Sequence, residues 1–429
     1  MENKMSKRKS IGFKIAAIVL LCALLACAMY GLVEIIRYRA VSKRCEEERA
    51  IPRVDVYTHL GAEITSKEDY VTCSVSISGT DIIMEKAEIR GRGNTTWEFY
   101  PKKPYRIKFD EKVSVFGERE NKSWVLLALY NDFSAVKDRL AFTMADALGT
   151  DVFVPSYNYV ELYLNGEYNG LYLMTDQVDE NKGRAGVKDD VDEMDASDVP
   201  FLVELDDYAP EEGVEGVDWF SVGGKPYNVK YPERDERSEE KADEQLQYIK
   251  NYIERVEAAC AAGDYEAFCE LVDVSSFIDF YIVQEVMGQP ELNWKSVYMY
   301  KAVGEKMKMG PVWDFDWGAM GPGLGKESNM YRGDVTGLRS SGNWFDLMLK
   351  NSPEFAADVR ARFAEAKPLL AAAIEAVRAD EARIKPYALR NHIRWHWFRV
   401  GTGSSRYYSE VLDWCSDRII WLEGYFSVV

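Results

Sequence analysis

The chain has few of the residues that most often build a metal or redox centre. Only 3 of its 429 residues are histidine and 7 are cysteine, and no Cys-x-x-Cys pair occurs. This composition excludes a zinc ribbon and a dense disulfide framework. His392 and His396 have the i, i+4 spacing of a helical metal site, but no acidic third ligand accompanies them and a zinc site is disfavoured. Cys260 and Cys269 flank a helix break and can pair, although core thiols are the simpler interpretation.

The chain also lacks an excess of positive charge. Its 53 Lys and Arg residues are outnumbered by 71 Asp and Glu residues, which gives a net charge of −18. Nucleic acid is therefore disfavoured as a partner, because phosphate backbones need a basic footprint, while a local basic patch can still bind small phosphates. Hydrophobic residues make up 47% of the chain, which predicts a sizeable core in one large domain or two.

The N-terminus is the one place where a long hydrophobic run occurs. Five cations precede an apolar run that begins at Ile15 and is long enough to span a bilayer. We predict a cytoplasmic basic segment over residues 1–14, a transmembrane anchor over 15–37, a charged linker over 38–50 and an extracytoplasmic domain over 51–429. The cations are Lys4, Lys7, Arg8, Lys9 and Lys14.

Two other interpretations of the N-terminus remain open. A cleaved signal peptide needs a shorter apolar region and a small-residue cleavage site, and no clear one is present. A lipoprotein is the second alternative, because Leu24-Leu25-Ala26-Cys27 is close to a lipidation box. Leu25 fits that box poorly and the apolar run continues past Cys27, so an uncleaved anchor is favoured.

The rest of the chain predicts an α+β fold, with a β-rich first part and a mainly helical second part. Asn165-Gly166 between alternating apolar runs predicts a hairpin, and Asp138 to Leu148 predicts a helix that stops at Gly149. Strands are predicted near residues 54–57, 70–77, 87–90, 105–109, 124–129, 159–164, 171–175, 296–301 and 306–309, and helices over about 244–261, 264–271, 275–287, 352–385 and 408–425.

The run from Gly310 to Gly318 places two carboxylates, Asp314 and Asp316, between bulky aromatics. Carboxylates in apolar surroundings are costly unless they are paired or hold a cation. Mg²⁺ typically takes one or two protein carboxylates together with substrate phosphates. The run therefore predicts a magnesium site, with two hydrogen-bonded structural aspartates as the alternative.

A second motif gathers cations in this otherwise acidic chain. Arg90 to Thr96 contains two glycines that permit tight turns with exposed N–H groups. Alternation along the strand near 105–109 places Arg106 and Lys108 on the face opposite Tyr105. Such a patch can cradle a phosphate chain, although a solvated strand face beside a glycine turn is the alternative. The order of a P-loop is absent.

The order of polar residues before Asp314 matches a pattern of phosphoryl-transfer enzymes. Glu291 is followed after four residues by Ser296, then by a predicted hairpin and Asp314. Protein kinases place a catalytic Asp, an Asn metal ligand and a second metal-binding Asp in the same order. Ser ligates Mg²⁺ in P-loop enzymes, and Glu can act as a base.

Together these motifs make the chain resemble the CotH kinase family, which is related to atypical protein kinases and named for a spore coat protein. The resemblance covers roughly residues 50 to 350. It is carried by 51–52 and 64–70, by Arg92-Gly93-Asn94 with Pro101-Lys102-Lys103, by Arg139 to Gly149, by the hairpin from Leu162 to Tyr172, and by Pro311 to Asp316.

The resemblance implies a kinase-like fold and a site that uses ATP and Mg²⁺. It implies that Asp314 binds the metal, assisted by Asp316 and Ser296, and that Glu291 orients or deprotonates a Ser/Thr hydroxyl. Cations that would hold the nucleotide phosphates are Arg92, Lys103 and Lys108. Glu291 and Ser296 depart from the Asp and Asn expected in the family, and the acid after the hairpin is the shorter Asp176.

The function that the resemblance implies is phosphate transfer from ATP to a surface or spore coat protein by a membrane-anchored kinase. Because Glu291 and Ser296 are altered, a catalytically weakened module that acts in envelope or spore coat assembly is the alternative. A third possibility is binding of a surface polymer through aromatic side chains, including 11 Trp. Core packing is the better explanation for those aromatics.

Overall fold

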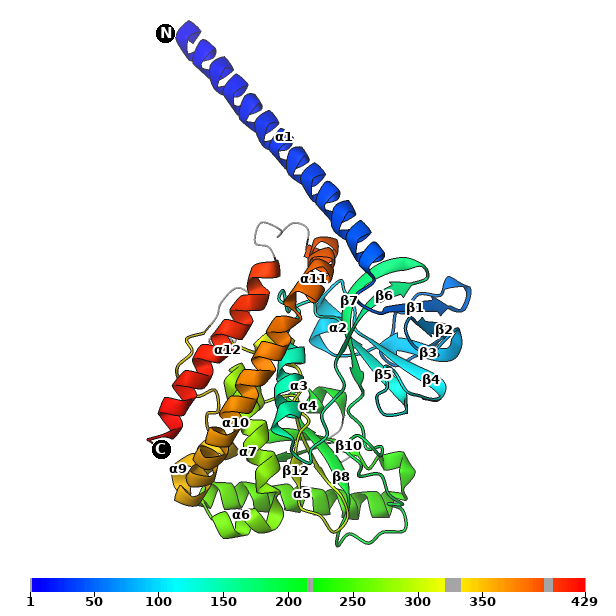
Figure 1. Cartoon of the computed structure of the whole chain (residues 1–429), viewed down its shortest axis with the longest axis vertical. Coiled ribbons are helices and arrows are strands. Elements are labelled where there is room, and N and C mark those ends of the chain that lie inside the picture. The colour runs from blue at the N-terminus through cyan, green and yellow to red at the C-terminus, as the bar shows by residue number, and fades with distance from the viewer. Residues whose placement is uncertain (1, 214–215, 217–218, 321–332, 397–403, 429) are drawn as a thin grey trace.

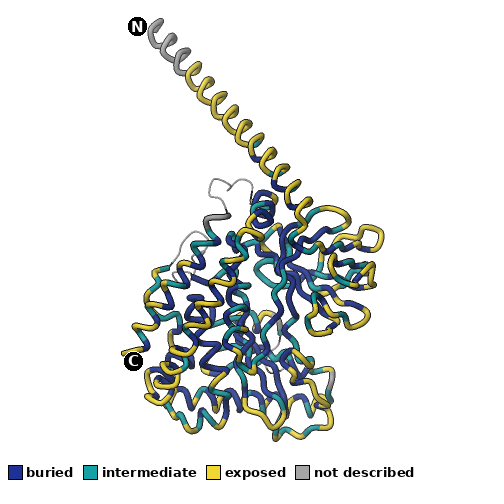
Figure 2. Tube along the Cα trace, in the orientation of Figure 1, coloured by how far each residue is buried: buried dark blue, intermediate teal, exposed yellow. Residues whose placement is uncertain are grey.

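The computed structural model describes residues 2–213, 216, 219–320, 333–396 and 404–428, and it begins with a single long helix that stands apart (Figure 1). This helix, α1 (Glu2–Glu48), is exposed along its apolar part from Phe13 onward (Figure 2). Within the described part of the chain, it is the one helix long and apolar enough to cross a membrane. A signal sequence passes the same test.

The last turns of α1 pack against α11 (Glu381–His396) near the other end of the chain. Arg390 of α11 lies 2.7 Å from Glu46, and the Tyr387 hydroxyl donates to the carbonyl of Cys45 at 3.2 Å. Residues 38–48, predicted as part of a linker, are therefore helical. The physical reason is a stripe at i, i+4 spacing among the charges, because Val41 and Cys45 are both buried.

A closed barrel of seven strands follows α1. Its strands are β1 (Arg53–Thr58), β2 (Val71–Ile77), β3 (Glu85–Gly91), β4 (Tyr105–Val113), β5 (Asn121–Leu127), β6 (Asn158–Leu164) and β7 (Glu167–Asp176), in the order β1-β2-β3-β4-β5-β7-β6. Parallel pairing of β1 with β6 closes the barrel. Ile107 and Phe109 point into its core, whereas Arg106 and Lys108 lie on the outer face, which confirms the predicted alternation.

The local signals in this part of the chain are also confirmed. β6 and β7 form an antiparallel hairpin, and Asn165 and Gly166 at its turn have φ of 52° and 84°. Both values are positive, as a tight hairpin turn requires. Helix α3 (Lys137–Leu148) follows β5 and ends at Gly149 in the left-handed conformation.

A second sheet lies below the barrel, with strand order β12-β11-β8-β10-β9. It contains β8 (Phe201–Leu205), β9 (Trp219–Val222), β10 (Lys225–Tyr231), β11 (Val297–Lys301) and β12 (Lys308–Met309). The β11–β12 hairpin confirms the prediction there. No strand was predicted for β8, whose five residues are all buried, because a short continuous apolar run carries no alternation.

Helices pack around the second sheet and against the barrel and complete an α+β fold, as the sequence predicts (Figure 1). Asp273 caps α7 by accepting a hydrogen bond from the N–H of Ser276 at 3.0 Å. The helices are α5 (Glu239–Ala262), α6 (Tyr265–Leu271), α7 (Val274–Met287), α9 (Trp344–Asn351), α10 (Pro353–Ala379), α11 and α12 (Ser404–Phe426).

Candidate active site

A cleft of about 1100 Å³ separates the outer face of the barrel from the second sheet. Strands β3, β4 and β5 form its roof, and β8, β10 and β11 form its floor, with the segment between β7 and β8 along one side. The roof is rich in cations, namely Lys67, Arg90, Arg92, Arg106, Lys108, Lys112 and Lys122. The floor holds the acids Glu204, Asp206, Glu233, Asp314 and Asp316, and its lysines Lys230 and Lys295 are paired with Glu204 and Glu291. This division of charge suits a ligand with anionic groups and a cation.

Glu291 lies on the floor side, in a short 3-10 turn (Pro290–Asn293) that follows α7. It is 1% exposed and its Oε1 lies 2.6 Å from Nζ of Lys295. A Cβ on Gly318 would stand 2.4 Å from Glu291 Oε2, so only a glycine leaves room for this carboxylate. Burial, and then the charge of Asp314, raise the pKa of Glu291 to about 7 against the opposing charge of Lys295.

Asp314 sits at the start of α8 (Phe315–Gly318) in a strained backbone conformation. Its φ is +65°, and Ser296 is likewise at +57°, a region that non-glycine residues seldom adopt. The Ser296 hydroxyl donates to Asp314 Oδ2 at 3.1 Å, and Gln289 Nε2 donates to the Asp314 carbonyl at 2.8 Å. Ser296 and Asp314 are two of the ten non-glycine residues with positive φ in the described part of the chain, so both residues that the sequence marks as metal ligands have a strained backbone.

Two further carboxylates accompany Asp314, and one of them comes from α3. Asp138 is 2% exposed and accepts a hydrogen bond from the N–H of Phe315 at 2.8 Å. Burial raises the pKa of Asp138 to about 7; the bond from Phe315 opposes this rise and the charge of Asp314 adds to it. Burial, then Asp314 and Asp138, hold the pKa of Asp316 well above its usual range.

A divalent cation fits this group of carboxylates electrostatically. Like charges gathered in a buried place raise one another's pKa, and a bound cation reverses that effect. Across the described residues, no set of three His, Cys, Asp or Glu side chains is close enough to form a complete protein cage for a metal. Mg²⁺ needs no such cage, because it keeps waters and is commonly held by one or two carboxylates and substrate phosphates.

The three cations predicted to hold phosphates have different surroundings. Arg92 lines the cleft and stacks 5.7 Å from the ring centroid of Trp313, and Lys108 lines it from β4. Lys103 is not among the residues that line the cleft. Its Nζ donates to the carbonyl of Trp97 in α2 (Thr95–Phe99) and lies 5.4 Å from the Trp97 ring.

Asp176, the acid after the hairpin, does not pair with a lysine. It is fully buried at the end of β7, where Arg184 lies 3.2 Å away and Arg119 lies 3.4 Å away. It also accepts a hydrogen bond from the N–H of Ser156 at 2.9 Å. This ion-paired network fixes the segment by which the chain leaves the barrel.

Sequence reasoning did not identify Asp138 or Lys295. Asp138 shares a helical face with Ala141 and Phe142, which are both buried, so a carboxylate on an apolar stripe was the available signal. Lys295 immediately precedes Ser296, and only the folded turn reveals that it pairs with Glu291. Although burial opposes the shift, Glu291 and Asp314 raise the pKa of Lys295, which keeps it a cation.

Comparison with known proteins agrees with this geometry. The family described as CotH kinase protein matches residues 89–422, which cover most of the chain and include both lobes of the cleft. A search among curated proteins finds no match. The chain therefore belongs to the CotH kinase family, whose kinase-like fold accounts for a β-rich lobe above a mainly helical one.

Proposed function

We propose that this protein transfers the γ-phosphoryl group of ATP to a Ser or Thr hydroxyl of another protein. The observation that carries the proposal is that Ser296 and Asp314 line the floor of one cleft opposite a cationic roof. Glu291 is buried beside them and is paired with Lys295, which also lines the cleft. The order and spacing of these residues follow those of protein kinases, and the hairpin between Ser296 and Asp314 is present.

Asp314 and Asp316, with the Ser296 hydroxyl, are the residues that would hold Mg²⁺. A Mg²⁺ ion held there would supply electrostatic stabilisation of the negative charge that develops on the phosphoryl group. Arg92 and Lys108 would bind the remaining phosphate oxygens from the roof. Phosphoryl transfer depends mostly on positioning and electrostatic stabilisation, so a small set of residues is sufficient.

Glu291 is the proposed base. The acceptor oxygen forms a bond with the γ-phosphorus, the bond from that phosphorus to the β–γ bridging oxygen breaks, ADP leaves and the hydroxyl proton passes to Glu291 Oε2. Among the described residues, no hydrogen-bond donor reaches this oxygen. A pKa of about 7 allows Glu291 to accept a proton near neutral pH. Lys295 holds the other carboxylate oxygen at 2.6 Å and so orients the base.

The apolar part of α1 supports a location at a membrane. We infer a single span, with the basic N-terminus in the cytoplasm and the kinase domain outside, since cations precede the span. In that setting the acceptor is a surface, envelope or spore coat protein. Protease added to intact cells should digest the domain, and protection in intact cells with digestion only after lysis would contradict this orientation.

The central test is phosphate transfer by the full-length protein in lipid nanodiscs. Labelled ATP, Mg²⁺ and a library of Ser- and Thr-containing peptides are the probes. We expect transfer by the parent and a loss of more than about 100-fold in Asp314→Asn and in Glu291→Gln. Asp81→Asn, an exposed acid in the turn between β2 and β3, is the matched control and keeps full activity. Equal transfer by parent and Asp314→Asn would show that the activity is not that of this cleft.

A second candidate function is a kinase-like module with weakened catalysis. The observation that favours it is the ammonium of Lys295 at 2.6 Å from the proposed base, combined with Ser296 where the family has Asn. The double substitution Glu291→Asp with Ser296→Asn separates the two. A large gain in transfer identifies a decayed enzyme, whereas a loss shows that the native pair is adapted to its own geometry.

A further inference from the structure

Two arginines face each other across the β3–β4 ladder in the roof of the cleft. Arg90 and Arg106 are partners in register, and both line the cleft. Side chains directly opposite in an antiparallel pair have their Cβ atoms about 4.5–5.5 Å apart, and like charges at that distance destabilise the sheet. The barrel therefore carries a local electrostatic cost at this position.

In the described part of the chain no salt bridge joins a carboxylate to either arginine, although the charge of Asp179 opposes the lowering of the pKa of Arg106. Arg106 donates through Nη2 to the neutral hydroxyl of Ser123 at 3.0 Å, and Arg90 lies 5.0 Å from the ring centroid of Tyr70. The Nε atoms of both arginines are buried and have no hydrogen-bond acceptor there. Burial lowers the pKa of Arg106, and the charge of Arg90 lowers it further.

The acids nearest in the fold are already engaged. Asp179 is ion-paired with Arg184 and accepts a hydrogen bond from the N–H of Asn181 at 3.1 Å. Arg184 also pairs with Asp176 at 3.2 Å. On β3 itself, Glu88 lies opposite Lys108 in the ladder. The positive charge of Arg90 and Arg106 thus exceeds the negative charge that the surrounding acids leave unpaired.

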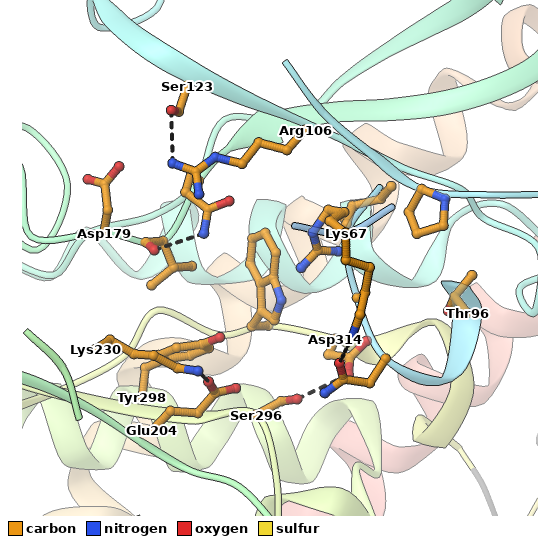
Figure 3. A pocket seen from close by; sticks show the side chains of 18 of the residues that line it. Lys67, Thr96, Arg106, Ser123, Asp179, Glu204, Lys230, Ser296, Tyr298 and Asp314 are labelled. Atoms are coloured by element: carbon orange, nitrogen blue, oxygen red, sulfur yellow. Dashed lines mark hydrogen bonds and ion pairs between the residues drawn. The ribbon is translucent and has the colours of Figure 1, made fainter. Parts of the chain in front are cut away.

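Arg106 lies on the wall of the cleft opposite the proposed metal carboxylates. Figure 3 shows Arg106 extending from the roof beside Ser123, whereas Asp314 lies with Ser296 across the cleft on the floor. An anion at Arg106 and an anion beside Asp314 would therefore bind to opposite walls of the cleft.

We propose that Arg90 and Arg106 form an oxyanion subsite that binds a phosphate group independently of the carboxylates of Asp314 and Asp316. A guanidinium presents a planar fork of donors that matches phosphate oxygens, and both arginines line the cleft. The group is either a phosphate of the bound nucleotide or the phosphate of a second ligand, such as a phosphorylated side chain. The proposal does not depend on phosphoryl transfer.

The test is calorimetric titration of the full-length protein in nanodiscs with inorganic pyrophosphate, in EDTA and without divalent metal. We expect binding that weakens roughly 10- to 100-fold in Arg90→Gln and in Arg106→Gln, because each loses charge-assisted hydrogen bonds. Asp314→Asn keeps the affinity, and so does Arg255→Gln, an exposed cation on α5. Absence of pyrophosphate binding overturns the proposal. A loss of pyrophosphate affinity in Arg92→Gln, with unchanged affinity in Arg90→Gln and Arg106→Gln, also overturns the proposal.

Thermal unfolding separates a binding role from a structural one. In phosphate-free buffer we expect Arg106→Gln to melt no lower than the parent, because it removes the repulsion from Arg90. Pyrophosphate should raise the melting temperature of the parent only. A variant that melts lower is titrated at a temperature at which its circular dichroism matches the parent's, and undiminished pyrophosphate affinity there overturns the proposal.

A final titration identifies the source of the phosphate. Pyrophosphate is added to protein saturated with ATP and Mg²⁺. If binding to the arginines disappears, the nucleotide itself extends to the subsite. If binding persists, the cleft holds a second ligand beside the nucleotide. Both results support the subsite, and neither depends on whether the protein transfers phosphate to an acceptor.

Discussion

Substitution of Gly318 by alanine tests the position of the proposed base without changing any polar group. The new Cβ would stand 2.4 Å from Glu291 Oε2 and 2.3 Å from Gln289 Oε1. Ordinary contact needs about 1 Å more. A third obstructing atom is Glu291 Cγ at 2.7 Å, so the Glu291 side chain has to move and not its carboxylate alone. All three atoms belong to side chains, and the backbone of α8 does not have to shift.

A displacement of about 1 Å at a reacting group can cost on the order of 100-fold in rate. That factor corresponds to about 2.7 kcal/mol of barrier, at 1.36 kcal/mol for each tenfold change. We expect kcat to fall by roughly this factor in Gly318→Ala while KM for ATP changes little, because the proposed nucleotide contacts lie on the roof and at Asp314. Stability should change little, since alanine is the better helix former.

The assay is steady-state transfer by full-length protein, with thermal unfolding measured in parallel. Gly424→Ala is the matched control, because its added Cβ, also within a helix, meets nothing within 4 Å. The double variant Gly318→Ala with Glu291→Asp shortens the side chain at 291 by one methylene, which makes room for the methyl added at 318. It should recover part of the lost rate. If Gly318→Ala folds normally and keeps the parent's kcat, the position of Glu291 does not matter to the chemistry and its assignment as base is wrong.

Three further predictions concern charge in the site and the core. The proposed base must be ionised, and burial beside Asp314 raises the pKa of Glu291 to about 7. We therefore expect kcat to rise with pH through that value and to be roughly tenfold lower at pH 6 than at pH 8. A flat pH–rate profile would contradict this. Asp138→Asn removes one of three like charges, so it should raise the free energy of unfolding by on the order of 1 kcal/mol while weakening Mg²⁺ binding in calorimetry. Arg418 lies 2.7 Å from the fully buried carboxylate of Glu285, and Arg418→Met removes this cation. The free energy of unfolding, measured by chemical denaturation, should fall by about 3–5 kcal/mol. The double variant with Glu285→Met should recover most of that loss.

Local signals predicted most strands of the barrel and its Asn165-Gly166 hairpin, but not the closure of those strands into a barrel. The turn at Asn165-Gly166 and the stop at Gly149 depend on backbone conformations that few other residues adopt, so neighbouring residues alone determine them. The polar face of β4, with Arg106 and Lys108, follows from a period of two. The second sheet was harder, because β8 is buried on every residue and its partners β10 and β11 are distant in sequence.

The residues of the candidate site likewise divide into those proposed from the sequence and those found only in the folded structure. Glu291, Ser296 and Asp314 follow one another along the chain, so their order alone revealed them. Asp138 lies about 180 residues before Asp316, and only the packing of α3 against α8 brings it to the same place. For Lys103 the sequence was misleading. It belongs to a cationic cluster in sequence, but its ammonium lies over Trp97 in α2 and not along the cleft.

The surroundings of Glu291 bear on whether the altered site is active or decayed. A glutamate carries its carboxylate about 1 Å further than an aspartate, and the chain has a glycine at 318, where any side chain would collide with that carboxylate. The carboxylate is also buried, which costs stability, and its cation Lys295 leaves Oε2 without a hydrogen-bond donor in the described structure. A module that needed only its fold would be more stable with an apolar residue at 291. Three features therefore favour an enzyme adapted to glutamate as its base. The carboxylate is costly to bury, the space at Gly318 fits its extra methylene, and the backbone is strained at Ser296 and Asp314.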